Sequence, residues 1–247
     1  MKPSYCFFVV LFLLIGCQNG DKLTFEPYQI ETESCDDCTK IHINLPRAID
    51  NGKLARTINT AMREEVISLL HFDDESEVSD IDTAIKSFKS GFLELQERYE
   101  DETTPWEAKI DSEITFEDSS ILTIALDAYI FTGGAHGYSS KRFLNFDKNK
   151  RTEIENWQLF KDSLAFRNLA ERKFRTKENI PQDKPINYTG FMFERDSFYL
   201  PENIGFTEKG MKLLYNQYEV SSFADGTIEL VLPYEEIQKF LEPKVGA

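Results

Sequence analysis

Two cysteines and a histidine near the start of this 247-residue chain have the residue types of a zinc site. Two residues separate Cys35 from Cys38, and three more separate Cys38 from His42. Zinc binds thiolates and imidazoles at such spacings, but a structural zinc site needs four ligands, and no second cluster supplies the fourth. A local disulfide between Cys35 and Cys38, or two free thiols, is therefore the simpler prediction. We expect no metal here.

Residue patterns typical of known catalytic mechanisms are sparse. The chain has three histidines, His42, His71 and His136, with no His-x-x-x-His pair. It has neither a Gly-x-Ser-x-Gly nucleophile elbow nor a phosphate-binding P-loop. The chain has 43 acidic residues, so no pair of carboxylates stands out as a catalytic pair. A glycosidase site depends on the distance between its two carboxylates in space, which the sequence does not give. The sequence favours a binding protein without a cofactor, and an enzyme acting on peptidoglycan or another glycan, a deacetylase or hydrolase, is the alternative.

Covalent lipidation is indicated at Cys17. Lys2 precedes an uninterrupted apolar run over residues 7–15, and Gly16 and Cys17 follow it. A positive start, a short apolar run and small residues form a secretion signal, because the run is too brief to span a bilayer. With a cysteine at the cleavage point, this start resembles a bacterial lipoprotein signal. The resemblance implies removal of residues 1–16 and a membrane anchor of several acyl chains on Cys17. An ordinary signal peptide that contains a cysteine is the alternative.

Charge limits the partners of the remaining chain. The formal net charge is −15, and it becomes −16 once Lys2 is removed, since 27 basic residues then face 43 acidic ones. Such a protein repels nucleic acid and other anionic polymers, and it attracts cationic proteins over about 8–10 Å in physiological salt. Solubility alone also explains an acidic exported protein. We expect no nucleic-acid partner.

Periodicity predicts the elements of the first half. Residues 17–40, which begin with the lipidated cysteine, are polar and lack a sustained period, so they are expected to form a tether. Residues 41–46 alternate as a strand does, and two helical stripes follow over 54–71 and 81–99. Ser79 or Asp80 is the expected N-cap of the second helix.

The second half is expected to be richer in strands. Alternation predicts strands at 106–116, 121–131 and 138–146, with a glycine-rich turn at 132–137. A helix over 157–177, a loop over 178–196, strands at 198–200, 210–220 and 227–232, and a short helix after Pro233 complete the chain. The expected class is α+β, a mostly antiparallel sheet with helices packed on one side. Residues 41–150 and 151–247 form its amino- and carboxy-terminal parts, in one continuous globule.

Two segments resemble a known family. The turn of a family of bacterial envelope domains of undetermined activity is similar to Phe131-Thr132-Gly133-Gly134-Ala135-His136-Gly137. The carboxy-terminal half of that family is similar to Asn216-Gln217-Tyr218-Glu219-Val220-Ser221-Ser222-Phe223-Ala224-Asp225-Gly226 and to Val231-Leu232-Pro233-Tyr234-Glu235-Glu236-Ile237. The resemblance covers about residues 41–241. The family also occurs as the non-catalytic amino-terminal part of certain peptidoglycan deacetylases and as the lysozyme-binding extracellular part of an anti-sigma factor.

These segments supply the candidate ligand-binding residues, each of which also has a structural interpretation. Glycines permit positive φ and close backbone approach in a turn, and a histidine within it can bond to neighbouring backbone. Tyrosines build cores as well as stack on sugars. A surface with exposed aromatic side chains near the histidine would favour binding. The candidates are Gly133, Gly134, His136, Gly137, Tyr138, Tyr218 and Tyr234.

We therefore expect a lipoprotein of the bacterial cell envelope, facing the periplasm or the cell surface and held to the membrane through Cys17. The resemblance implies two partners, a cationic protein such as lysozyme and peptidoglycan, and the net charge favours the first. Binding without a cytoplasmic segment would suit an inhibitor or scavenger. A structural subunit of an envelope complex is a third hypothesis.

Overall fold

A six-stranded sheet forms the centre of the computed structural model, which describes residues 23–32, 38–72, 78–99 and 104–242. Neighbouring strands are antiparallel except for the second and third. In spatial order the strands are β1 (Phe25–Glu31), β2 (Lys40–Ala48), β3 (Glu107–Glu117), β4 (Ile121–Phe131), β5 (Tyr138–Asp147) and β6 (Thr152–Glu153).

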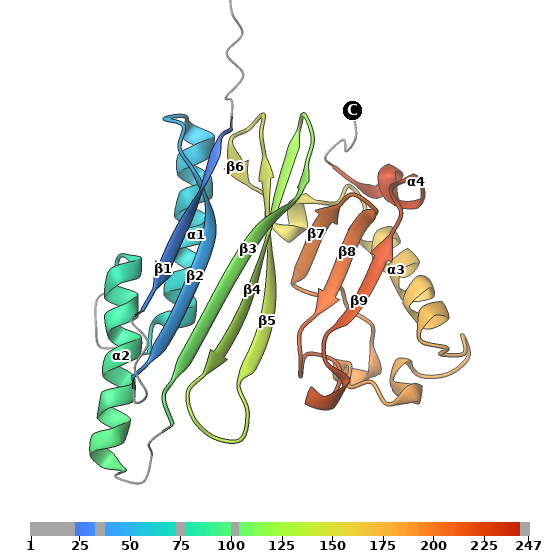
Figure 1. Ribbon diagram of the computed structural model, residues 1–247. Helices are drawn as coiled ribbons and strands as arrows, with labels where there is room; N and C mark the ends of the chain where they lie inside the picture. The colour runs from blue at the N-terminus through green and yellow to red at the C-terminus, as the bar shows by residue number, and fades with distance from the viewer. Residues whose placement is uncertain (1–22, 33–37, 73–77, 100–103, 243–247) are drawn as a thin grey trace, which may run out of the picture.

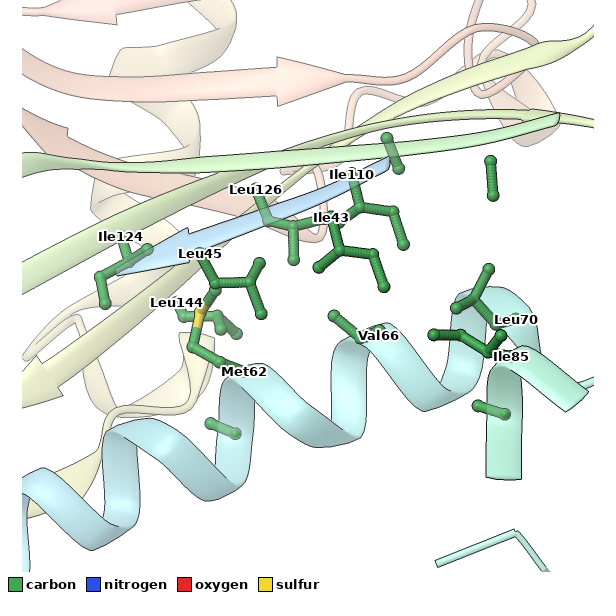
Figure 2. Packing of buried hydrophobic residues seen from close by; sticks show 14 of the residues in the cluster. Ile43, Leu45, Met62, Val66, Leu70, Ile85, Ile110, Ile124, Leu126 and Leu144 are labelled. Carbon is green, nitrogen blue, oxygen red and sulfur yellow. The ribbon is translucent and has the colours of Figure 1, made fainter. Parts of the chain in front are cut away.

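Two helices cover one face of this sheet. Helices α1 (Lys53–Leu70) and α2 (Ile81–Arg98) lie between β2 and β3 in the chain, and this long crossover allows those two strands to run parallel. Figure 2 shows Met62 and Val66 of α1 pointing at side chains from β2 to β5. Each fully buried apolar side chain of this kind contributes about 1.5–3 kcal/mol. The apolar stripes of the sequence are therefore the faces that form the first core.

A three-stranded sheet lies on the opposite face of the large sheet, with a third helix beyond it (Figure 1). Its strands are β7 (Asn203–Thr207), β8 (Gly210–Tyr215) and β9 (Ile228–Leu232), and the helices of this half are α3 (Ser163–Lys177) and α4 (Tyr234–Ile237). Short 3-10 helices lie in the connections: η1 (Asn156–Gln158), η2 (Ile186–Thr189), η3 (Glu194–Asp196), η4 (Phe223–Asp225) and η5 (Gln238–Phe240).

The two sheets touch over only part of the large sheet. Ala125, Phe143 and Leu214 form a small buried cluster between them. The buried Asn145 accepts from Thr123 Oγ1 at 2.8 Å and donates to the Ile204 carbonyl at 2.7 Å. Strand β7 thus crosses the large sheet at one end, and the other end of the same face stays open.

The structure confirms the α+β class with mostly antiparallel sheets. The helices divide between the sheets, with α1 and α2 on the large sheet and α3 on the small one. Within the described residues, none of the helices combines the length and the hydrophobicity that a membrane crossing requires. The signal, Cys17 and Cys35 lie outside the described residues.

Several expected boundaries need correction. Strand β1 occupies part of the expected tether, because its half-buried Phe25, Tyr28 and Ile30 pack against the first core. The expected strand at 198–200 is absent from the described structure, and β7 forms at 203–207 instead. The strand expected over 210–220 ends at Tyr215, because a turn follows.

Candidate ligand-binding site

The glycine-rich turn joins β4 to β5, and its glycines have different roles. Gly133 and Gly134 have φ values of 97° and 85°, in the left-handed region that favours glycine. Gly137 is required by packing instead, since a Cβ added to it would lie 2.5 Å from the Tyr129 ring. The close approach holds the Tyr129 ring against the backbone of the turn.

The carboxy-terminal segment reaches this turn from the other sheet. The ring of His136 stacks on Phe223 of η4 with a centroid separation of 4.0 Å and an interplanar angle of 19°. Tyr218 packs on the same Phe223 ring at 5.5 Å. The two segments that carry the family resemblance, about 80 residues apart in sequence, therefore meet at one place.

Asn216 fixes this meeting of the sheets. Its Oδ1 accepts from the Lys141 amide at 2.8 Å, and its Nδ2 donates to the Lys141 carbonyl at 3.1 Å. The Glu219 carboxylate accepts from the backbone amide of Asn216 at 2.9 Å and closes the turn after β8. A side chain that pairs with both backbone groups of one residue replaces a missing strand partner. The carboxy-terminal turn is thereby held along β5.

We call the three rings that pack on one another here the aromatic rim: His136, Tyr218 and Phe223. Tyr218 is 59% exposed, whereas Phe223 is half-buried beneath His136. Tyr138 is 43% exposed but pairs in register with Ile130, which packs against the first core, so the structure does not bring it into this stack. Tyr218 has a positive φ of 67°, which is uncommon for a tyrosine. Rings that are exposed yet fixed by stacking offer contact area at small entropic cost.

Acidic groups accompany the aromatic rim. Burial raises the pKa of the Glu219 carboxyl, and the hydrogen bond from the Asn216 backbone opposes this rise only in part. Burial also raises the pKa of the Tyr138 hydroxyl, with a further contribution from Glu219. The His136 Nδ1 lies 3.2 Å from the Gly137 carbonyl, which is the backbone contact considered for it from sequence. The aromatic rim therefore combines aromatic surface with a half-buried acidic group.

Other candidates lie elsewhere. Tyr234 packs on Phe116 and Phe206, and its hydroxyl donates to the Thr207 carbonyl at 2.7 Å, so the structure does not bring it to the aromatic rim. Cys38 is disulfide-bonded, and its pairing with Cys35 stays a prediction because Cys35 is not described. No group of three or more potential ligands in the described ranges is arranged to hold a metal ion.

Sequence reasoning left Phe223 and Asn216 out of the candidate residues. Both lie in the carboxy-terminal segment that resembles the family, and this resemblance is the one feature of the sequence that points to them. Their role depends on contacts with His136 and Lys141, and no local pattern shows such contacts. This arrangement can offer a ligand fixed aromatic rings and a neighbouring acidic group.

Two family models match successive parts of the chain, and both families are bacterial and envelope-associated. A family model described as "Deacetylase PdaC" matches residues 32–139, and the model "Protein of unknown function (DUF3298)" matches residues 146–235. No curated protein sequence matches the chain.

Two crystal structures share the fold. One is a DUF3298 family member from Bacteroides fragilis, with 18% identity, a TM-score of 0.70, and coverage of 90% of this chain and 94% of that one. The other is a DUF3298 family protein from Pseudomonas aeruginosa, with 18% identity, a TM-score of 0.66, and coverage of 91% and 97%.

Proposed function

Because this chain carries a PdaC domain followed by a DUF3298 domain, we propose that it is a non-enzymatic, lipid-anchored binding module of the bacterial envelope. We propose further that the aromatic rim contacts a cationic protein such as lysozyme. The observation that carries the proposal is the stack of His136 on Phe223, which joins the two segments of the family resemblance at one exposed place.

Charge supports a cationic partner. The chain has a formal charge of −15, and Glu219 lies beside the exposed rings. Opposite charge speeds the encounter of two proteins, and aromatic anchors slow their separation. Peptidoglycan, the other partner implied by the resemblance, is disfavoured by the same charge wherever it is anionic.

The orientation of the domain also supports the proposal. Phe25, at the start of β1, pairs with Ala48 at one end of the sheet, and the glycine-rich turn lies at the opposite end (Figure 1). The seven residues of β1 span roughly 23 Å of that length. A lipid on Cys17 would therefore be attached at the end of the sheet opposite the glycine-rich turn and the aromatic rim.

Calorimetric titration of residues 18–247 with lysozyme tests the proposal at low and high salt. We expect binding that weakens as salt rises, because screening reduces the attraction. Tyr218→Ala should lower the affinity about tenfold or more, as loss of an aromatic anchor does. Tyr188→Ala is the matched control, since Tyr188 is 58% exposed and lies outside the aromatic rim. Absence of heat at both salt concentrations would remove lysozyme as the partner.

Two further measurements test the lipid anchor and the absence of enzymatic activity. Mass spectrometry of native protein should find an acylated amino terminus at Cys17, and an unmodified start upstream of it contradicts the anchor. Incubation with peptidoglycan should release neither acetate nor sugar. Release that is lost in His136→Ala would show an enzyme instead.

A further inference from the structure

A groove opens beside the aromatic rim, on the part of the large sheet that β7–β9 leave uncovered. It has a volume of about 370 Å³ and is lined by residues of β3, β4 and β5 together with residues on and next to β8 and β9. Volumes of this order are typical of small-molecule sites. The side chains that carry the argument are Lys109, Asp111, Asp127, Tyr129, Lys141 and Glu229.

The charges of this lining are paired within the protein. Lys141 Nζ lies 2.9 Å from Asp127, and Lys109 Nζ lies 3.5 Å from Asp111. Glu229 contacts Lys212 Nζ at 2.8 Å. The groove therefore presents carboxylate acceptors beside ammonium donors.

The arrangement keeps two carboxylates side by side. Asp111 and Asp127 are direct partners in the register of β3 and β4, and like charges at opposed positions destabilise a sheet. His42 Nε2 at 3.0 Å from Asp111 and the two lysines offset this repulsion. Acidic residues that serve only to keep a protein soluble do not have to be neighbours, so solubility does not explain this pair.

The pairing selects the chemistry of a ligand. A charged ligand has to break an ion pair before it gains one, so it loses much of its binding energy. A hydroxyl group both donates and accepts, and it can bridge a carboxylate and an ammonium group without separating them. Ser139, the register partner of Tyr129 on β5, adds a hydroxyl group to the same face.

An aromatic wall completes the site. The Tyr129 ring lines the groove and is held by its contact with Gly137 of the glycine-rich turn. A half-buried, fixed ring suits the apolar C–H face of a sugar, while polar side chains orient its hydroxyl groups.

We propose that this groove binds a neutral saccharide, whose hydroxyl groups bridge the paired carboxylates and ammonium groups of the lining. The inference goes beyond the proposed recognition of a cationic protein, because it rests on other residues and another ligand. Binding of a neutral ligand should depend little on salt, whereas lysozyme binding should depend strongly on it.

Nuclear magnetic resonance titration tests the inference on nitrogen-15-labelled protein spanning residues 18–247. Chitotriose and maltotriose are added separately up to about 10 mM, a range that detects weak binding. The two sugars distinguish acetamido glycans from plain glucose polymers, and binding of either supports the inference. We expect shift changes at groove residues, with a dissociation constant that changes less than about twofold between low and high salt.

Asp127→Asn should weaken the saccharide affinity about tenfold, because it removes a charged acceptor. Ser139→Val, on an exposed position of β5, should also weaken it and provides a second variant if the first is unstable. Glu113→Gln is the matched control, an exposed acid on β3 outside the groove lining. Absence of shifts with both sugars, or binding that survives both groove variants unchanged, overturns the inference while leaving the lysozyme proposal standing.

Discussion

His42 joins three strands through the two nitrogens of its ring. Nδ1 contacts Glu31 of β1, and Nε2 lies 3.0 Å from Asp111 of β3. The side-chain hydrogen bond to Asp111, then that to Glu31, raises the pKa of His42 above its usual value of 6.5. At the residue scale this histidine is therefore a charge-dependent link between β1 and β3.

The link predicts a pH dependence of stability. A raised pKa in the folded state means that the stabilisation is fully present below the ordinary pKa and is lost as pH rises through the raised one. The free energy of unfolding should therefore fall as pH rises above about 6.5, and the fall should be smaller in His42→Gln. Urea unfolding at several pH values measures it, with His136→Gln as the control. Equal pH slopes in the parent and His42→Gln would contradict the link.

Gly137 gives a second prediction at the residue scale. Gly137→Ala should lower the free energy of unfolding by about 1–3 kcal/mol, because the new methyl group overlaps the Tyr129 ring. The loss should shrink in a Tyr129→Ala background, since the overlap is gone, and a double-mutant cycle by urea unfolding measures this coupling. A coupling near zero would show that the ring moves aside freely.

Among the elements, helix α2 begins at a capping box. The Asp80 carboxylate accepts from the Thr83 amide at 2.8 Å, and the Asp80 amide donates to Thr83 Oγ1 at 3.2 Å. Of the two residues that the sequence offered as N-caps, the structure uses Asp80. The pKa of the Asp80 carboxyl is lowered, and the hydrogen bond from the Thr83 backbone is the largest cause.

Asp80→Ala should lower the melting temperature and the urea midpoint, because it leaves helix amide groups without an acceptor. Ser79→Ala, one residue earlier and also exposed, should stay within about 0.5 kcal/mol of the parent. Thermal and urea unfolding of the two variants provide the comparison. A larger loss for the serine variant would reverse the assignment of the cap.

At the scale of the whole molecule, two hydrophobic cores share one large sheet. The first lies between this sheet and helices α1 and α2, and the second lies around the small sheet and α3. The second core also includes Phe116 and Ile121 of the large sheet, so the two halves of the chain are packed together. This packing leaves uncovered the end of the sheet where the groove and the aromatic rim lie.

Asn145 provides a test of the joint between the sheets. Asn145→Ala should cost about 2–3 kcal/mol, because the Ile204 carbonyl and the Thr123 hydroxyl lose their buried partner. Asn149→Ala, in the exposed turn after β5, is the control and should have little effect. Urea unfolding measures both, and equal effects of the two variants would show that the buried contact contributes nothing.

The sequence by itself determined the elements whose periodicity is local. The stripes of α1 and α2, the alternation of β3 and β5 and the glycine-rich turn all follow from residues a few positions apart. The family resemblance also came from contiguous motifs, and both domains were found.

Only the tertiary structure decided the edge strand β1, the crossing of β7 and the site. Local patterns report which face of an element is buried, but they do not report what covers it. His136 stacks on Phe223, and the Asn216 side chain bonds to the Lys141 backbone, although these partners are distant in sequence. The groove is likewise lined by segments that are distant in sequence. Such contacts form only when the second sheet packs across the first, because each partner alone has no geometric preference for the other.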